Sequence, residues 1–474
     1  MWPSLFKIVG GSLVAVAVLW ALVLGWWQSN DYEPTRLELA MYLGALPLAI
    51  VGGYFLLKGF IEHLKTPVEA EKPKDQALAD LDPLALAAAK TSAAEREFSI
   101  RLVSAHVVTA TGMDTESLLA AIKDGTRPAP SQLFTDADGF PVFLARVEDL
   151  DDSAILEEFD GDKRITEQLE AREYLKRAMA LLSKVTDQAT ETLSRNLNEA
   201  KARLMLNIVL LIPSTWSSLD LPALKAWLKK RYWSDLQDDR LSIEIVTVSH
   251  ESVALRRLDE IILDANRDAD SHAMTLVLGA MSSIDANAID ALDASGRLFS
   301  AKRQEQCIPG EGAVALLLAN SVILAADAQE QASILGRVAL AARDKPLDGG
   351  GRIRGKTIEQ LISGLLDVTG IECATIKSVV ADADHRAACL TEILDGLGQP
   401  FEHLDPIEDC VTVGSACGAM SPFGGLVALA CGHAKALAED AHVLVISNQH
   451  PTERGVLLVS PPSAQKPKND SAHT

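Results

Sequence analysis

The chain has 474 residues, enough for more than one domain or for one large α/β unit. Hydrophobic residues make up 48% of it and aromatic residues only 5%, which suits helices packed tightly on a buried sheet. The formal net charge is 44 − 65 = −21, and because an acidic surface repels phosphate backbones, nucleic-acid binding is not expected. The cysteines form no Cys-x-x-Cys pair, so the sequence favours free thiols in a reducing compartment over a zinc or disulfide framework. These six cysteines are Cys307, Cys373, Cys389, Cys410, Cys417 and Cys431.

Two uncharged apolar runs lie near the N-terminus, at residues 8–27 and 39–57. A membrane-spanning helix needs about 20 such residues, so the runs predict a transmembrane hairpin within residues 1–65. A cleaved signal peptide is the competing interpretation of the first run, but no small-residue cleavage site precedes the second run. Lysines precede the first run and follow the second, which places both termini in the cytoplasm. We therefore expect a multi-pass protein of a bacterial inner membrane, in contact with the lipid bilayer, whose soluble part faces the cytoplasm.

The remaining chain reads as a linker, a soluble domain and a disordered tail, at residues 66–97, 98–462 and 463–474. In the soluble domain, strand-like runs alternate with helical stretches, which predicts a mostly parallel sheet covered by helices on both faces. The order of elements is similar in residues 98–305 and 306–462, which suggests an internal duplication. Strands are predicted at residues 99–109, 206–212, 241–248, 273–279, 312–318, 333–342, 376–380, 441–447 and 455–460, and helices at 114–123, 164–206, 223–230, 252–266, 357–368 and 387–396.

Four segments stand in an order that is typical of one enzyme family. They are residues 107–141, which begin VVTATGMD, residues 276–283 (LVLGAMSS), residues 309–318 (PGEGAVALLL) and residues 414–425 (GSACGAMSPFGG). In this order the chain resembles the β-ketoacyl-ACP synthase family from about residue 98 to 460. The resemblance implies a thiolase-like α/β fold of duplicated βαβ sheets layered with helices, and no cofactor. It also implies that the glycine-rich turns form part of a binding site. The candidate binding residues there are Gly310, Glu311, Gly312, Gly414 and Gly418.

The chemistry of that family needs a cysteine at a helix N-terminus, where the helix dipole favours the thiolate that attacks an acyl thioester. The resemblance places this group after the strand at residues 241–248, where His250 stands instead. Ser249 or Ser252 could replace the thiol only with an activating base. Glu251 and Ser252 at the start of the helix are interpreted as capping groups.

Two histidines complete the family's site by assisting decarboxylation of a malonyl donor and holding its enolate. The first should follow the strand at residues 376–380, and His385 is in that neighbourhood but in a different sequence context. The second should follow Gly414, where Ser415 stands. His250, Ser249, His385 and Ser415 are thus the candidate catalytic positions, and most of them carry substituted residues.

Residues 350–357 (GGRIRGKT) provide a rival motif, because they fit the phosphate-loop pattern G-x-x-x-x-G-K-T. A helix is predicted to follow, and Asp382 ends a strand that could hold magnesium. A phosphate loop, however, requires a buried strand that ends directly at the first glycine, and here the candidate strand stops near residue 342. A nucleotide site that uses Lys356 remains an alternative, and a surface loop is the favoured interpretation.

The sequence therefore predicts a membrane-anchored ketosynthase-like protein that lacks condensing activity, since function has to be argued from the site and the reactive groups are missing. Its expected ligands are an acyl chain, an acyl carrier protein or a partner subunit, and a homodimer or a heterodimer with a related subunit is implied by the resemblance. One alternative is an active synthase or decarboxylase with altered residues. Another is an adaptor or scaffold for an envelope or secretion machine.

Overall fold

The computed structural model describes residues 91–159, 163–199, 204–268, 273–324, 326–347, 349 and 354–464, together with Trp20, Trp26, Gln28 and Ser29. The chain divides into two compact units, residues 1–88 and 89–474, and the fold below is that of the second. Nearly all of the two predicted membrane segments and of the predicted tail lies outside the described residues. In the part of the chain that is described, no helix combines the length and the apolar character needed to cross a bilayer.

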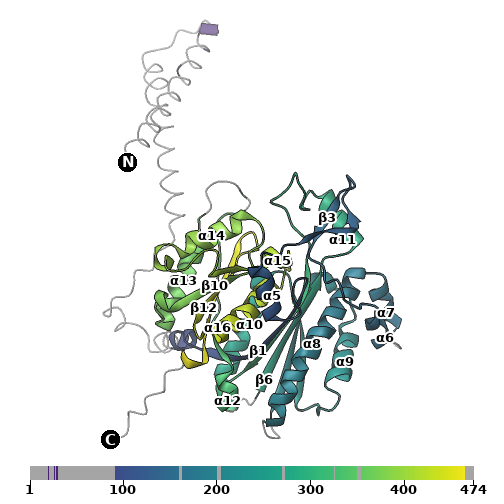
Figure 1. The fold of residues 1–474 in the computed structure, drawn as a ribbon, viewed down its shortest axis with the longest axis vertical. Helices are drawn as coiled ribbons and strands as arrows, with labels where there is room; N and C mark the ends of the chain where they lie inside the picture. The colour runs from purple at the N-terminus through teal and green to yellow at the C-terminus, as the bar shows by residue number, and fades with distance from the viewer. Residues whose placement is uncertain are drawn as a thin grey trace. The chain divides into compact units, whose positions relative to one another are not determined.

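Strands and helices alternate through most of the second unit (Figure 1). The strands are β1 (Ser99–Thr109), β2 (Ala129–Thr135), β3 (Pro141–Leu144), β4 (Met205–Pro213), β5 (Leu241–Val248), β6 (Ala273–Ser282), β7 (Glu311–Ala319), β8 (Ser333–Gly336), β9 (Ala339–Ala342), β10 (Ile376–Ala381), β11 (Cys410–Thr412), β12 (His442–Ser447) and β13 (Glu453–Ser460). The α-helices are α5 (Thr115–Lys123), α6 (Ala154–Glu158), α7 (Lys163–Glu170), α8 (Glu173–Glu199), α9 (Leu221–Tyr232), α10 (Glu251–Arg267), α11 (Ala286–Ala294), α12 (Ala326–Glu330), α13 (Lys356–Thr369), α14 (Ala387–Leu397), α15 (Gly414–Cys417) and α16 (Gly424–Glu439).

The main sheet is built from two topologically identical halves. Its strand order is β11-β10-β12-β13-β8-β1-β7-β6-β4-β5, and the halves meet where β8 pairs with β1. Strand β9 lies off this path and pairs with β13. When the five strands of each half that lie on the path are numbered along the chain, both halves read 3-2-4-5-1 from the outer edge inward. The duplication suggested by the order of elements is therefore visible in the sheet. It divides the chain between β7 and β8, so that β7, which the sequence placed in the second half, is the fifth strand of the first.

The sheet is mixed, which corrects the prediction of a mostly parallel sheet. In each half one strand runs against its neighbours: β7 is antiparallel to β6 and β1, and β13 is antiparallel to β12 and β8. The pairs β4–β5, β4–β6, β10–β11 and β10–β12 are parallel. A strand buried on both faces is apolar at every position whatever its direction, so the apolar runs carry no signal for the direction of β7 or β13.

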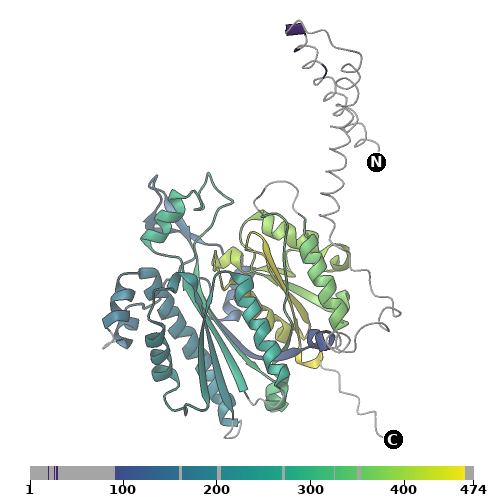
Figure 2. The same ribbon diagram turned by 180° about the vertical axis from the view of Figure 1, so that it is seen from behind.

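Three apolar clusters show that the molecule is layered. One cluster joins the outer face of β4, β6 and β7 to α8 and α9, and another joins the outer face of β10, β12 and β13 to α13 and α14. The third and central cluster lies between the two half-sheets and contains α10 and α16. Figures 1 and 2 show the blue-to-teal half and the green-to-yellow half side by side, each with helices on its outer face.

Helix α16 is enclosed by protein along most of its length, and glycines allow the closest contacts on its surface. Its residues from Gly424 to His433 are all buried. A Cβ atom on Gly432 would lie 2.6 Å from Cγ2 of Val445, which is well inside van der Waals contact. The glycines therefore let the helix lie directly against β12.

Most predicted elements are present within a few residues of their expected ends, including β1 and β5 with the predicted bounds. Two elements were predicted as continuous and are interrupted. The helical region at 164–206 divides into α7 and α8 and ends before β4 begins, and the strand at 333–342 divides into β8 and β9. The β2–β3 hairpin was not predicted, because its exposed positions hide any alternation of apolar residues.

The enclosure of α16 makes a testable prediction about two glycines in helices. Gly432→Ala should lower the free energy of unfolding by about 1–3 kcal/mol, because the added methyl group has no room beside Val445. Gly364→Ala in α13 is the matched control, since a Cβ atom there would have nothing within 4 Å, and alanine should stabilise that helix by about 0.5–1 kcal/mol. Urea unfolding of the purified full-length protein measures both. Equal stability of Gly432→Ala and the wild type would contradict the enclosure.

Candidate functional site

Three chain segments converge where parallel strands of both half-sheets end. The N-terminus of α10 follows β5, Asp382 follows β10 directly, and the β12–β13 loop begins at Asn448. In α/β sheets, ligand sites form at the carboxyl ends of strands. The convergence therefore marks the candidate site, and it includes the position at which the sequence resemblance placed a nucleophile.

Asp382 is the best-anchored residue of this site. It is 1% exposed, and its carboxylate accepts a hydrogen bond from the Ser447 hydroxyl at 2.5 Å. The backbone N–H groups of Asn448 and Gln449 donate to the same carboxylate at 2.7 and 3.1 Å. Gly424 brings α16 close, since a Cβ atom there would lie 3.3 Å from that of Asp382. The residue that directly follows β10 is therefore a fixed, buried acid and not His385.

Glu251 is buried beside Asp382 without comparable support. It is the first residue of α10 and is 2% exposed, and neither of its carboxylate oxygens has a hydrogen-bond partner of normal geometry among the described residues. The N-cap of α10 is His250, so Glu251 is not the cap residue that the sequence predicted but an acid in the first turn of the helix. A buried polar group without a partner costs free energy.

The two carboxyl groups share one dry environment and hold their protons tightly. Burial raises the pKa of Glu251, although the Ser421 hydroxyl and the Arg386 guanidinium act in the opposite direction. Burial, followed by repulsion from Glu251, raises the pKa of Asp382 to about 7. Two carboxylates in one site cannot both ionise easily, so burial and mutual repulsion favour the protonated form of the pair.

His250 forms a second polar cluster on the other side of the α10 N-terminus. Its Nδ1 lies 2.9 Å from the hydroxyl of Ser252, which also donates to Glu453 at 3.4 Å. Its ring lies 4.7 Å from the ring of His450, and burial together with this neighbour lowers the pKa of His450. Ser252 thus contacts side chains and does not act as the predicted cap of α10.

The other two candidate catalytic positions do not join this cluster. Nε2 of His385 lies 3.0 Å from the carbonyl oxygen of Gln304, and its ring meets the edge of Phe299. Ser415 is buried in α15, where its hydroxyl donates to the carbonyl oxygen of Thr412 at 2.6 Å. The structure therefore does not bring His385, Ser415 and His250 together through any contact that it shows.

The two glycine-rich turns lie against each other. A Cβ atom on Gly310 would lie 2.2 Å from the carbonyl oxygen of Cys417, and one on Gly418 would lie 2.8 Å from that of Ile308. Gly418 also has a positive φ of 65°. A Cβ atom on Gly312 would lie 2.6 Å from the side chain of Met420. A Cβ atom on Gly414 would lie 2.4 Å from the carbonyl oxygen of Asp382. These glycines permit close backbone approach around the site.

Glu311 in the first turn is the acceptor of a buried ion pair. Its oxygens lie 2.5 and 2.9 Å from the guanidinium nitrogens of Arg177, and both residues are almost fully buried. The backbone N–H of Val147 and the hydroxyl of Ser282 also donate to it, at 2.8 and 2.7 Å. These contacts of Glu311 all lie within the protein, where they tie β7 to β6 and α8.

The cysteines do not supply a nucleophile to the site. All six are free, as the sequence predicted. Burial raises the pKa of Cys307, Cys410 and Cys417 to about 11, so these thiols stay protonated at neutral pH, whereas a nucleophile requires the thiolate. In the described ranges, no group of three or more His, Cys, Asp or Glu side chains is arranged to hold a metal ion.

A cavity of about 620 Å³ opens beside the candidate site, within the range of small-molecule pockets. It lies at the carboxyl ends of β4, β5 and β6 and is lined by Ser249 and Ser421, among others. Ser249, predicted as a catalytic position, therefore faces this cavity. Ser421 lines the same cavity, and its hydroxyl is one of the groups that lower the pKa of Glu251 against the effect of burial.

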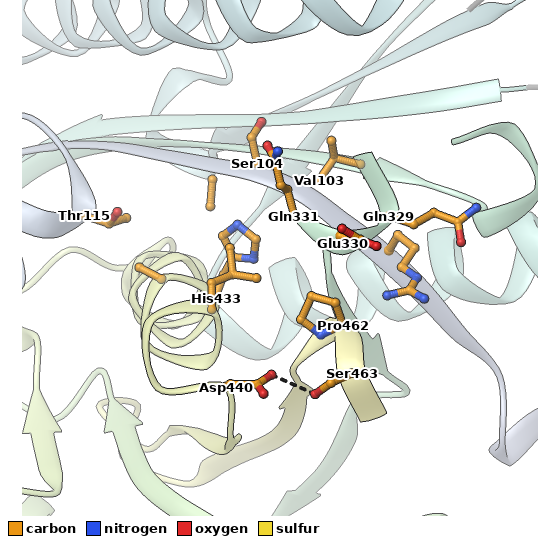
Figure 3. Close-up of a pocket in the computed structure, with 14 residues that line it drawn as sticks. Val103, Ser104, Thr115, Gln329, Glu330, Gln331, His433, Asp440, Pro462 and Ser463 are labelled. Atoms are coloured by element: carbon orange, nitrogen blue, oxygen red, sulfur yellow. Dashed lines mark hydrogen bonds between the residues drawn. The ribbon is translucent and has the colours of Figure 1, made fainter. Parts of the chain in front are cut away.

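A second cavity, of about 1070 Å³, lies between β1, α12 and the C-terminal end of α16. Figure 3 shows His433 facing it, with the hydrogen bond between Ser463 and Asp440 at its edge. Nδ1 of His433 lies 2.7 Å from the Ser333 hydroxyl, and burial lowers its pKa to about 4, so the ring is neutral. This cavity is lined by α16 from His433 onward, which is about 14 Å along the helix from Gly424 beside Asp382, and it is separate from the candidate site.

The rival phosphate-loop motif lies partly outside the described residues, which resume at Arg354. Gly355 is the N-cap of α13, but the side chain of Asp395 already accepts its N–H at 2.6 Å. A Cβ atom on Gly355 would lie 2.1 Å from the backbone nitrogen of Gly396. This glycine therefore allows α13 to pack on α14, and a carboxylate occupies the place where a phosphate would bind.

Neutralising Glu251 should change the pH dependence of stability. An acid whose pKa is raised by folding stabilises the protein below its unfolded pKa and loses that contribution as the pH rises through its folded pKa. Glu251→Gln should therefore leave the midpoint of thermal unfolding almost unchanged near pH 4 and raise it by several degrees at pH 8. The exposed Glu402→Gln is the control, and a lower midpoint for Glu251→Gln at pH 8 would rule out the buried pair.

Nucleotide binding at the rival motif can be tested directly. Because Asp395 occupies the N-terminus of α13, Mg·ATP should not raise the thermal unfolding midpoint of the full-length protein. Lys356→Ala, an exposed substitution, should leave that midpoint unchanged with or without nucleotide. A midpoint that rises with Mg·ATP in the wild type and not in Lys356→Ala would restore the nucleotide interpretation.

Comparison with solved structures identifies the fold. No family model matches the chain, and no curated protein matches it in sequence. Among solved structures, the ishigamide ketosynthase/chain length factor has a TM-score of 0.53 at 16% identity, covering 77% of this chain and 99% of the other. A type II polyketide ketosynthase solved with its acyl-carrier protein and bound to the hexaketide has a TM-score of 0.54 at 12% identity, covering 77% and 99%. The module 6 ketosynthase of the bacillaene synthase from Bacillus subtilis 168 has a TM-score of 0.53 at 13% identity, covering 78% and 72%. The second unit of the chain thus has the thiolase-like α/β fold of ketosynthases.

Proposed function

We propose that this chain is a membrane-anchored ketosynthase-like protein that lacks condensing activity and binds an acyl chain, an acyl carrier protein or a partner subunit at the cytoplasmic membrane face. One observation carries the proposal. At the N-terminus of α10, where the resemblance places a nucleophilic cysteine, the residues are His250 and Glu251, and no thiol is near in sequence. A buried acid, Asp382, follows β10 and Ser415 replaces the second histidine.

The cavity beside the site supports ligand binding without condensation. A fold that keeps a pocket at its strand ends but loses the thiol and both histidines can hold a ligand, whereas it has no group for forming the acyl-enzyme. A similar structure was solved with its acyl-carrier protein, which makes a carrier protein a reasonable partner to test. The membrane anchor rests on the apolar runs at residues 8–27 and 39–57.

Strand β5 supports a dimer, either with a second copy or with a related subunit. It is the last strand of the main sheet and pairs only with β4 within the described residues, so its outer edge is free for another strand. An unpaired edge is a template for pairing. Glu244 and Thr247 are exposed on this strand and limit how an unrelated chain could join it.

An enzyme with altered residues is the second candidate, and one contact favours it. Ser252 and His250 lie within hydrogen-bond distance, 2.9 Å, so a hydroxyl and a base are paired at a helix N-terminus. Decarboxylation of a malonyl thioester assisted by His250 would be the corresponding activity. A scaffold role in an envelope or secretion machine has no contact in the described structure that favours it.

Native mass spectrometry of the full-length protein with acyl- and malonyl-loaded carrier protein tests the proposal. We expect a non-covalent complex with the carrier protein, no acyl group transferred to the chain and no loss of carbon dioxide, because no cysteine stands at the N-terminus of α10 to accept the acyl group. A covalent acyl adduct would contradict the proposal. Loss of carbon dioxide that disappears in His250→Ala would establish the altered enzyme, and the absence of any complex would favour the scaffold.

A further inference from the structure

A third cavity, of about 900 Å³, opens beside helix α13. Its wall is formed by one flank of α13, by residues 96–99 at the start of β1, by β8 and the turn that leads to β9, and by the end of β13. It shares no lining residue with the cavity of about 620 Å³ that Ser249 lines. Its volume is within the range of about 300–1,000 Å³ that is typical of small-molecule pockets.

The duplication of the sheet explains why this face is open. In the first half, α8 has 27 residues, about 40 Å of helix, and packs on β1, β6 and β7 (Figure 1). In the second half, α13 has 14 residues, about 21 Å of helix, and packs on β9 and β13. Helix α13 is therefore too short to cover β8, the counterpart of β1, as α8 covers β1. Ile334 of β8 lines the cavity instead.

Apolar side chains form most of the cavity wall. Leu361, Leu365 and Val368 follow one another along α13 at spacings of four and three residues, which places them on one flank of the helix. Val338 and Ile371 add to the apolar lining. All of these except Leu365 are only half-buried, so apolar surface remains available to a ligand.

The polar groups of the wall already have hydrogen-bond partners within the protein. Nε and Nη2 of Arg337 donate to the carboxylate oxygens of Asp259, both at 2.7 Å, and Nη1 donates to the carbonyl oxygen of Glu95 at 2.7 Å. Nδ1 of His442 lies 2.8 Å from the hydroxyl oxygen of Ser460. The other charged lining residues are exposed, and they are Arg96, Glu97 and Glu372. A ligand in this cavity therefore meets apolar contact and not a buried charge.

Gly364 is an independent sign that the cavity is kept open. It lies inside α13 and lines the cavity, although glycine weakens a helix relative to alanine. Neither backbone conformation nor packing requires a glycine there, because its φ is not positive and a Cβ atom would have nothing within 4 Å. The lack of a side chain at this position instead leaves the space beside the helix free.

We propose that this cavity binds the hydrocarbon chain of a single-chain amphiphile, such as a fatty acid, with the head group in the solvent. An apolar wall whose polar groups are already hydrogen-bonded favours a hydrocarbon chain, since a polar molecule would lose hydrogen bonds to water without replacing them. The inference goes beyond the proposed function, because the cavity is separate from the candidate site and needs no ligand there.

Photolabelling of the full-length protein in lipid nanodiscs tests this site. The probe is palmitic acid that carries a diazirine near the end of its chain, and peptide mapping by mass spectrometry shows where it attaches, even though the probe also enters the bilayer. We expect label on peptides that contain the α13 flank or the turn between β8 and β9. Unlabelled palmitate and palmitoyl-lysophosphatidylcholine should both compete, because they share the chain, whereas butyrate should not.

Gly364→Leu provides a variant that blocks the cavity. Its side chain should lower the labelling of these peptides about tenfold or more, because it fills space that the chain would occupy. Gly364→Ala is the matched control, and its methyl group should change the labelling by less than about twofold. Both substitutions replace glycine by a better helix former with open space around Cβ, so neither should lower the thermal unfolding midpoint.

The outcomes separate this inference from the proposed function. Equal labelling of these peptides in the wild type and in Gly364→Leu would overturn the cavity as the binding site. Competition by only one of the two palmitoyl compounds would overturn recognition through the chain. Label that appears only on peptides of the cavity lined by Ser249 would agree with the proposed function and overturn this inference.

Discussion

The structure depends on how closely α16 is held between the two half-sheets. Its buried residues include large apolar side chains, and glycines at 424, 425 and 432 provide the space where neighbouring side chains come closest. At its N-terminus the same closeness sets the site, because a Cβ atom on Gly424 would lie 3.3 Å from the Cβ of Asp382 and one on Gly425 would lie 3.2 Å from the hydroxyl oxygen of Ser447. The close packing of α16 therefore determines both the central layer and the geometry of the candidate site.

Burying the carboxyl groups of Asp382 and Glu251 costs folding free energy, and the protein compensates this cost better for Asp382 than for Glu251. Asp382 recovers much of its desolvation through one hydroxyl and two backbone N–H donors. Glu251 has only the positive end of the α10 dipole and distant help from Ser421 and Arg386. A buried acid without a partner is a poor device for stability, whereas strongly shifted pKa values in a cleft are typical of functional sites. Because of this difference, substitution of Glu251 is the most direct test of the site.

The sequence predicted the strands and helices well because continuous apolar runs and amphipathic helices leave strong local patterns. It failed where the outcome depends on distant residues. The break between β8 and β9 coincides with Arg337, whose guanidinium is held by both carboxylate oxygens of Asp259 in α10 at 2.7 Å. The acid site was missed for a different reason: the family's chemistry requires a histidine after this strand, so residue type pointed to His385 although Asp382 stands first after β10. Position relative to the strand end was the better signal.

The contacts of His250 explain why binding is a better account of this site than covalent catalysis. In a serine-based catalytic triad, the base contacts the nucleophile through one ring nitrogen and an acid through the other. Here Glu453 contacts the Ser252 hydroxyl itself, and the ring next to His250 is that of His450. His450 is in turn fixed by backbone N–H donors from Thr452 and Glu453 to its Nδ1, at 3.3 and 3.1 Å. Among the described residues, no acid therefore orients His250 as a base toward Ser252, and the hydroxyl is shared between two acceptors. The cluster therefore holds the β12–β13 loop against the N-terminus of α10, which is a structural role and needs no covalent step.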